Sequence, residues 1–354
     1  MADSVSSIKY LKTAASLAFD ALREGRLPLS PRRWLIDLRH LRSYMAGRAG
    51  IMEAPPPPQP EETAAAVRAL VETCRSELVN FIGSGDELRF VEDDQPTVSV
   101  LLVLHNRAEL TLRCLKRLRE RLSVPFELVI VDNHSTDDTE VVLRRLCGVT
   151  VLPQSENLGF LRACNLAAHT ARGTHLLFLN NDTEIQAGAV EAALETLESD
   201  ASIGVVGGRL VFPDGRLQEA GSIIWSDGSC VGYGRGDWPE APQYPYSRDV
   251  DYCSAAFMLT SRQLFRDLGG FDDRYQPAYY EDVDYCVRAW KANRACRLRT
   301  ARHRPAHRVC KFLIGVRSDH DATRTSRRVR GRTSRLAGCP AAGVDDDQGC
   351  VDRP

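Results

Sequence analysis

The sequence lacks the features that would assign the chain to several large classes of protein. Its longest apolar runs, such as VSVLLVL at residues 98–104, have the length of a core strand and are far too short to cross a bilayer. The first residues contain no apolar core of a secretory signal. Lysines and arginines number 46 against 47 aspartates and glutamates, so no overall charge attracts nucleic acid. We therefore expect no nucleic-acid partner, and any membrane contact should be peripheral.

The cysteines are also missing the patterns that would give them a role. Eleven cysteines are scattered along 354 residues, with no CxxC pair and no Cys/His cluster at metal-binding spacing. Their odd number and irregular spacing argue against a disulfide framework and for reduced thiols. We therefore expect a cytoplasmic protein, either free or held peripherally at the inner face of the cytoplasmic membrane.

The first part of the chain is predicted to be a helical extension over residues 1–54. Arginines alternate with apolar residues at helical spacing in segments such as PRRWLIDLRHLRSYM. Two interpretations stand: a helical pair packed on the following domain, or a basic amphipathic helix that contacts anionic headgroups. Residues 55–96 then form a proline-rich linker followed by the helix EETAAAVRALVETCRSELVNFI.

Residues 97–293 alternate apolar strands with amphipathic helices. The predicted strands are VSVLLVL, FELVIVD, VTVLP and HLLFLN, separated by helices. This alternation predicts an α/β fold with a parallel sheet covered on both faces. Ligands of such sheets bind beyond the carboxyl ends of the strands. Polar clusters stand there, beginning at His105, Asp132, Glu156 and Asn180.

Three of these strand ends carry candidate ligand contacts. Asp132 can accept hydrogen bonds from a base or ribose, or it can cap the next helix. Gly159 precedes a helix and would let backbone N–H groups approach an anion, a weak signal by itself. Asp182 follows the strand HLLFLN, where a carboxylate can hold Mg²⁺ or Mn²⁺ against a diphosphate. The alternative for Asp182 is an Asx turn that closes the strand.

The segment GGFDDRYQPAYYEDVDYCVRAWKAN, residues 269–293, is the most specific of the chain. Glu281, Asp282 and Asp284 stand at a predicted helix start, with Val283, Val287 and Trp290 expected on its apolar face. Acids at a helix start also complement the helix dipole, which explains part of the pattern. The two preceding tyrosines and the tight turn favour a general base that deprotonates a sugar hydroxyl.

Together these motifs resemble the family 2 glycosyltransferases, and within them the bacterial rhamnosyltransferase-like enzymes of cell-surface polysaccharide assembly. The segments that carry the resemblance are, in order, VSVLLVLHNR, ELVIVDNHSTDDT, ENLGFLRACNLA, HLLFLNNDTEI and GGFDDRYQPAYYEDVDYCVRA. The resemblance implies a GT-A fold, the nucleotide-diphospho-sugar transferase fold, with a mainly parallel central sheet. It also implies inversion at the anomeric carbon, a nucleotide-diphosphate sugar donor, and a glycan or lipid-linked acceptor.

The resemblance also implies roles for individual residues. Asp282 matches the catalytic base of the family's ED motif, and Asp182 matches the last, metal-binding Asp of its DxD motif. Asn180 replaces the first Asp of that motif, which weakens the expectation of Mg²⁺ or Mn²⁺ dependence. Residues 221–236 are similar to the family's acceptor-side loop. The nucleotide-sugar pocket is expected to include Asn106, Asp132, Asn157, Gly159, Asn165 and Asn180.

Two rival functions can be compared with this one. A nicotinamide-dependent oxidoreductase would carry GxGxxG after the first strand, where the sequence reads HNRAEL without a glycine. The other rival is a relic that keeps nucleotide binding without turnover. The sequence names neither the sugar, the nucleotide nor the acceptor.

The relic hypothesis arises from residues 294–354, which we expect to form an aberrant, disordered tail. Between Arg294 and Arg335 there are about fourteen basic residues against two acids, without strand or helix periodicity. One allowed codon choice, read one nucleotide later, gives GRVVYEPRAIVRHIEFASSS, which resembles the family and supplies its metal-binding histidine. We therefore hypothesise a frameshift near Asn293. The alternative is a natural basic tail that binds nucleic acid or anionic lipid.

Overall fold

The structure is a computed structural model that describes residues 60–225, 227–299 and 310–312. The predicted extension over residues 1–54 lies outside these residues, as does the proline-rich part of the linker. The helix predicted after it is confirmed as α3, Pro60–Ser84. Within the described ranges, no helix is both long enough and apolar enough to cross a membrane.

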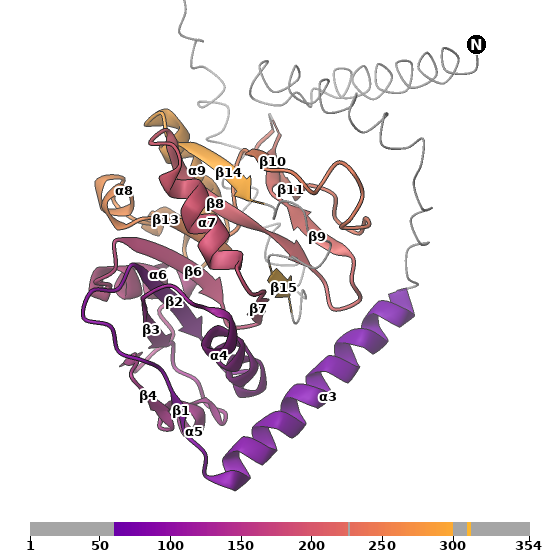
Figure 1. Ribbon diagram of the computed structural model, residues 1–354, viewed down its shortest axis with the longest axis vertical. Coiled ribbons are helices and arrows are strands. Elements are labelled where there is room, and N and C mark those ends of the chain that lie inside the picture. The colour runs from indigo at the N-terminus through magenta and orange to yellow at the C-terminus, as the bar shows by residue number, and fades with distance from the viewer. Residues whose placement is uncertain (1–59, 226, 300–309, 313–354) are drawn as a thin grey trace, which may run out of the picture.

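A mixed sheet forms the centre of the fold, in the strand order β12-β14-β8-β13-β6-β2-β3-β5 (Figure 1). The four predicted strands are confirmed as β2 Val98–Leu104, β3 Phe126–Asp132, β5 Thr150–Pro153 and β6 His175–Asn180, all mutually parallel where they pair. The other half contains β8 Ile203–Val211, β12 Arg248–Asp249, β13 Phe257–Ser261 and β14 Ala295–Arg299. There β13 runs antiparallel to both β6 and β8, so the sheet is mainly but not wholly parallel.

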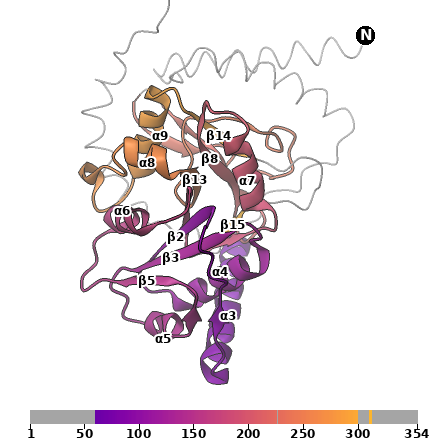
Figure 2. The same cartoon turned by 60° about the vertical axis from the view of Figure 1, so that its left-hand side comes forward.

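Helices cover both faces of the sheet, as the continuous apolar strands predicted. Along β2, Val100 and Leu102 enter one core, whereas Leu101 and Val103 enter the other. The first core lies under α3, α4 Ala108–Arg121 and α7 Ala189–Glu198. The second lies under α6 Phe160–Thr170, α8 Arg262–Asp267 and α9 Glu281–Lys291 (Figure 2).

The helix predicted after β3 is shorter than expected. It is α5, Thr139–Leu143, and the chain then forms β4, Leu146–Cys147, which pairs with β1, Leu88–Arg89. Gly148 has a φ of 74°, and a Cβ there would meet the carbonyl oxygen of Phe90 at 2.2 Å. Because residues 146–147 pair with β1 in this close approach, the helix ends before the point to which periodicity alone would continue it.

Further short strands follow β6 along the chain, some in the main sheet and some outside it. They are β7 Thr183–Ile185, β9 Leu217–Ala220, β10 Ser222–Ile224, β11 Cys230–Gly232 and β15 Cys310–Phe312, with the 3₁₀ turn η2 Asp273–Tyr275 before α9. The strands β10 and β11 form a separate antiparallel hairpin. In the main sheet, β9 pairs with β8, and β15 pairs with both β7 and β8.

We expected the residues after Asn293 to be disordered, and this prediction is wrong for two segments of the tail. The strand β14 runs parallel to β8 and buries Ala295, Cys296 and Leu298. The strand β15 pairs with β7 and β8 through its backbone. Hydrogen bonding and burial of alternate residues give β14 a packing role that its arginines concealed. The rest of residues 294–354 lies outside the described part of the chain.

The apolar face of α9 also differs from the prediction. Tyr285, Cys286 and Ala289 are fully buried, whereas Trp290 is 38% exposed. Helix α9 packs on the sheet through a stripe that is shifted by one residue from the one that hydrophobicity indicated. The residues predicted to form its apolar face lie at the margin of this stripe.

Candidate active site

The strands β2, β3 and β6 end side by side at one edge of the sheet. Leu104 lies opposite Asp132, and Val103 lies opposite Asn180 in the parallel register. The loops that follow these strands therefore begin next to one another, as the sequence analysis expected from the carboxyl-end rule.

Asn106 and Asp132 are joined through the turn that follows β3. The Oδ1 atom of Asn106 accepts from the backbone N of Thr136 at 2.8 Å, and its own backbone N donates to Ser135 Oγ at 2.9 Å. The backbone N of Ser135 donates to Asp132 Oδ1 at 3.0 Å. Asp132 therefore closes a local turn with one carboxylate oxygen, and its proposed contact with a nucleotide would use the other.

Asn133 is a residue to which sequence reasoning gave no role. Its side chain is 2% exposed, its Nδ2 donates to Asn157 Oδ1 at 2.8 Å, and its Oδ1 accepts from the backbone N of Leu158 at 2.8 Å. One buried amide thus ties the loop after β3 to the loop before α6. The only signal in the sequence was its place directly after Asp132.

Gly159 and Asn165 connect this edge to the segment before α9. Gly159 precedes α6 with a φ of 77°, and a Cβ there would lie 2.8 Å from the carbonyl oxygen of Pro277. The amide of Asn165 donates to the Phe271 carbonyl at 2.8 Å and accepts from the Phe271 backbone N at 2.9 Å. The Asn165 side chain therefore holds the GGFDD turn in the structure, and its place in the nucleotide pocket remains a prediction.

Asp182 lies between β6 and β7, in a turn that is held against α4. The neighbouring Asn181 donates its Nδ2 to Thr111 Oγ1 at 2.9 Å. Burial, followed by the charge of Asp182, raises the pKa of the Cys114 thiol well above its usual range, which places this carboxylate near α4. No group of three His, Cys, Asp or Glu side chains forms a metal cluster among the described residues. The donors still fit Mg²⁺ or Mn²⁺, which need one or two carboxylates when phosphate oxygens and water complete the shell.

Asp282 stands in the first turn of α9, as predicted, and is 7% exposed. Its Oδ2 accepts from the backbone N of Ala255 at 3.1 Å, and its Oδ1 accepts from the backbone N of Val283 at 2.9 Å. Tyr279 and Tyr280, the two residues directly before α9, have φ values of 75° and 70°. Residues with large side chains rarely adopt this left-handed conformation, and such strain is often found at functional sites.

Two adjacent alanines bring the Asn180 and Asp282 motifs together. The backbone N of Asn180 donates to the carbonyl oxygen of Ala256 at 3.2 Å, and the backbone N of Ala255 donates to Asp282. Motifs separated by about a hundred residues thus meet at the start of β13. The antiparallel strand makes this possible, because it brings the chain back to the edge where β6 ends.

The β10–β11 hairpin also lies near Asp282. Burial, followed by the charges of Asp282 and Asp227, raises the pKa of the Cys230 thiol to about 12, and a hydrogen bond with Tyr280 opposes this shift. The hairpin falls within residues 221–236, the segment that resembles an acceptor-side loop. The base candidate is therefore near both the strand-end edge and this hairpin.

The remaining acids of α9 have different surroundings. Glu281 is 2% exposed. Asp284 accepts from Tyr275 Oη at 3.3 Å and from Arg288 Nε at 2.7 Å. Because Arg288 also donates to the carbonyl oxygens of Leu268 and Gly270, Asp284 fixes the turn before the helix.

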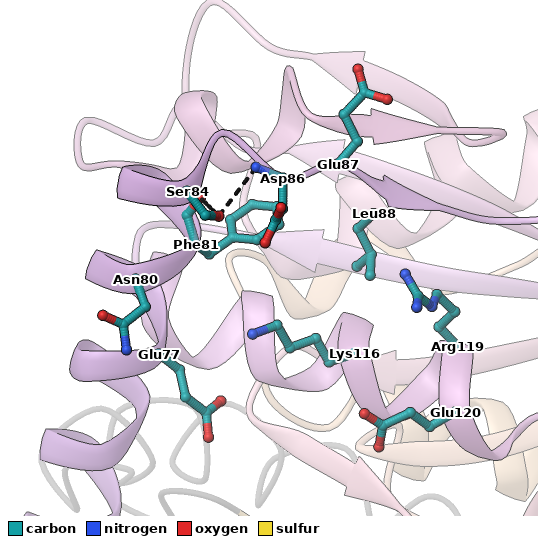
Figure 3. Close-up of a pocket in the computed structure, with 10 residues that line it drawn as sticks. All are labelled: Glu77, Asn80, Phe81, Ser84, Asp86, Glu87, Leu88, Lys116, Arg119 and Glu120. Carbon is teal, nitrogen blue, oxygen red and sulfur yellow. Dashed lines mark hydrogen bonds between the residues drawn. The ribbon is translucent and has the colours of Figure 1, made fainter.

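A cavity of about 600 Å³ lies between α3 and α4, away from this edge (Figure 3). The helix α4 begins beside the strand ends at Ala108, and its contribution to the cavity comes from its far half. The cavity therefore belongs to the opposite edge of the sheet. Its lining mixes carboxylates and cations: Glu77, Asn80, Phe81, Ser84, Asp86, Glu87, Leu88, Lys116, Arg119 and Glu120.

Comparison with known proteins shows which protein family this domain resembles. Residues 99–269 match the family described as Glycosyl transferase family 2. The O-antigen biosynthesis protein RfbC of Myxococcus xanthus is 29% identical over 201 residues, which cover 53% of this chain and 16% of that protein. The N-acetylglucosaminyl-diphospho-decaprenol L-rhamnosyltransferase of Mycobacterium tuberculosis is 28% identical over 174 residues, covering 43% of this chain and 57% of that enzyme. The chain thus matches less than two thirds of the length of either relative.

A solved structure supports the fold independently of the motifs. The crystal structure of S. aureus TarS 1-349 superposes with a TM-score of 0.50 at 16% identity, covering 69% of this chain and 67% of that one. At this identity the likeness concerns the fold alone. Residues 99–269 therefore form a domain that matches glycosyl transferase family 2, and the sheet that carries it has the GT-A fold.

Proposed function

We propose that this chain is an inverting glycosyltransferase that moves a sugar from a nucleotide-diphosphate sugar to a hydroxyl of a cell-surface glycan or glycolipid. The observation that carries the proposal is the junction at Ala255 and Ala256, which contact Asp282 and Asn180 respectively. A base and a diphosphate-binding edge must lie within one sugar of each other for direct displacement, and this junction supports such an arrangement. The similarity to a rhamnosyltransferase favours a deoxyhexose or hexose as the transferred sugar.

The donor would lie over the loops that follow β2, β3 and β6. Asp132 is proposed to read the nucleotide base, with Asn106 and Asn157 beside it in the pocket. Cross-linking of these loops by Ser135 and Asn133 supports a preformed site, because loops held by each other need little ordering when a ligand binds.

Asp182 is proposed to hold Mg²⁺ or Mn²⁺ against the diphosphate, with Asn180 as a neutral neighbour. When bound, the ion would neutralise the charge that develops on the departing diphosphate. The single carboxylate in the Asn180–Asp182 turn supports this role, since the diphosphate oxygens supply the remaining anionic ligands.

Asp282 is proposed to take the proton from the acceptor hydroxyl. As that oxygen forms its bond to the anomeric carbon, the bond from this carbon to the diphosphate oxygen breaks on the opposite face. One displacement with one protein base gives inversion, unlike the two-carboxylate chemistry of retaining glycosidases. The two backbone donors that fix the Asp282 carboxylate support this role, because a general base must be held within reach of its proton.

The experiment that tests the proposal is titration of the purified full chain with a panel of nucleotide-diphosphate sugars, with and without Mn²⁺, followed by transfer assays. Metal-dependent binding and transfer to a glycan or lipid-linked acceptor would support the transferase. Binding without any transfer would favour the relic. In that case, removal of one nucleotide near the codons for Asn293 and Arg294 should restore activity if the frameshift hypothesis holds.

A further inference from the structure

One stripe of α9 begins with the proposed base and continues to an exposed tryptophan. Asp282, Cys286 and Trp290 follow one another at intervals of four residues and therefore lie along one side of the helix. Each of them is hydrogen-bonded to the backbone of the same extended segment, residues 250–255, which we call the strap.

The hydrogen bonds between the strap and α9 follow the stripe from Trp290 to Asp282. Trp290 donates its Nε1 to the carbonyl oxygens of Val250 and Asp251, both at 3.2 Å. The backbone N of Cys253 lies 3.5 Å from the Cys286 sulfur. The last bond is the 3.1 Å contact between Ala255 and Asp282. The strap is thus fixed to α9 at both ends and in the middle, over about 12 Å of helix.

The opposite side of the strap holds the β10–β11 hairpin. The Oδ2 atom of Asp251 accepts from the backbone N of Ile224 at 3.0 Å. The next residue, Tyr252, forms an isolated antiparallel bridge with Ser222. Asp251 therefore contacts the hairpin with its side chain, while its carbonyl oxygen is held by Trp290.

Trp290 contributes little to the core for a residue of its size. It is 38% exposed, whereas Tyr285, on the neighbouring face of α9, is fully buried. This partly exposed indole donates to two carbonyl oxygens. Its role is better explained by fixing the position of those carbonyl groups than by hydrophobic packing.

We propose that Trp290 and Asp251 are positioning residues for the acceptor: together they set the β10–β11 hairpin at a fixed distance from Asp282. This inference rests on the proposed function, because it takes the hairpin as the acceptor side of the site. Neither residue touches the reacting atoms, and each acts through the strap. Loss of the Trp290 or Asp251 side chain should weaken acceptor binding and leave the donor pocket unchanged. Among the described residues, no hydrogen bond joins the strap to the loops after β2 and β3.

The test compares Trp290→Phe, Asp251→Ala and Asp251→Asn in the full chain. Loss of one hydrogen bond should raise the acceptor KM by about three- to tenfold in Trp290→Phe and in Asp251→Ala. Nucleoside diphosphate affinity, and kcat at saturating acceptor, should change less than about twofold. Asp251→Asn should restore most of the acceptor KM, since its amide oxygen still accepts from Ile224. The double variant Trp290→Phe/Asp251→Ala should cost less than the sum of the single variants, because both act on one strap.

Asp249→Ala is the matched control. Asp249 lies two residues before Asp251 and pairs with Arg297 at 2.8 Å, on β14 rather than on the hairpin. Its removal should leave the acceptor KM unchanged. An equal rise in Asp249→Ala, or an unchanged acceptor KM in Trp290→Phe and Asp251→Ala, would overturn the inference.

A second measurement needs no turnover. Backbone amide exchange at Ile224 and its hairpin neighbours should become at least about fivefold faster in Asp251→Ala and in Trp290→Phe, and remain at the wild-type rate in Asp249→Ala. Unchanged exchange in the first two variants would overturn the inference even if the enzyme is inactive. Failure of the proposed function is a separate result, because it appears as absence of transfer in the wild-type chain.

Discussion

The edge proposed to hold the donor and the side proposed to hold the acceptor, here called the donor edge and the acceptor side, are built in different ways. At the donor edge, three parallel strands deliver their loops to one place, and hydrogen bonds between neighbouring loops fix Asn106, Asp132 and Asn157. On the acceptor side, the hairpin, the strap and α9 come from distant parts of the chain and meet through hydrogen bonds from backbone N–H groups to side-chain carboxylates. The donor edge is therefore a consequence of the sheet, whereas the acceptor side depends on a few specific contacts.

The two regions also hold their carboxylates differently. Asp132 and Asp182 are partly exposed at the ends of strands, where an incoming cation or ribose can reach them. Asp282 and Glu281 are buried at the start of a helix, whose dipole favours their negative charge. Substitutions in the two regions should consequently fail in different ways: loss of donor binding at the donor edge, and loss of turnover or weaker acceptor binding on the acceptor side.

The largest effect is expected from Asp282→Asn. The amide keeps the size of the carboxylate and can still accept from Ala255, but it takes no proton. We expect kcat to fall by about 10²-fold or more with nucleoside diphosphate affinity little changed, measured by initial rates and calorimetry. Asp273→Asn, an exposed partner of Arg162 in the preceding turn, is the control and should stay near wild type. Near-normal turnover in Asp282→Asn would refute the assignment.

The next largest effect should come from Asp182→Ala, which removes the only carboxylate of the Asn180–Asp182 turn. Mn²⁺-dependent binding of the nucleoside diphosphate should be lost, as it should be after chelation, because Asn180 and Asn181 offer only neutral ligands. Calorimetric titration with and without Mn²⁺ measures this, and Asp200→Ala, at an exposed turn, serves as the control. Equal affinity with and without metal in the wild type would point to a metal-free site.

A moderate effect is expected from Asn133→Ala at the junction of two donor loops. Removal of a buried amide leaves its partners at Asn157 and Leu158 unsatisfied and should cost about 1–3 kcal/mol of unfolding free energy. Nucleotide affinity should fall as well, because the loops lose their mutual support. Denaturant unfolding and calorimetry measure the two quantities, with the exposed Asn80→Ala as the control. A stable variant with full nucleotide affinity would show that the donor edge does not need this link.

The smallest effect concerns the opposite edge of the same sheet, at Glu127. Although burial raises its pKa, hydrogen bonds from Ser99, Arg172 and Gly173 outweigh it, and the net pKa lies below its usual value. A lowered folded-state pKa stabilises the protein above the unfolded value of about 4.5, and this stabilisation is lost as the pH falls through the folded pKa.

Glu127→Gln should therefore be less stable than the wild type at neutral pH, and its stability should fall less steeply below about pH 4.5. Unfolding midpoints between pH 3 and pH 7 measure this difference. Identical pH profiles for wild type and variant would mean that the Glu127 hydrogen bonds contribute nothing to the acid sensitivity.

The donor edge could largely be predicted from the sequence. Four apolar strands, their parallel order and the clustering of Asp132 and Asn180 follow from periodicity and from the rule for carboxyl ends. Asn133 could not be recognised, because the role of a buried amide depends on Asn157, which lies in a different loop. The short α5 was also unpredictable, since residues 146–147 pair with the distant β1 instead of continuing the helix.

The acceptor side was far less accessible. Local pattern placed Asp282 at a helix start, but it gave no reason for that helix start to lie near the end of β6. That depends on β13, an antiparallel strand whose partners are distant in sequence. The arginines of β14 hid a strand that the sheet accommodates, because alternate positions hold Cys296 and Leu298. The strap is invisible in the sequence, since it is held through backbone groups that every residue carries.

The central claim is that Asp282 directs a single displacement at a donor held over the ends of β2, β3 and β6. The anomeric configuration of the first product formed by the full chain tests it most directly, by proton NMR of the transferred sugar before any mutarotation. We predict the configuration opposite to that of the donor, and its formation should depend on Asp282. A product with the donor's own configuration would contradict the claim.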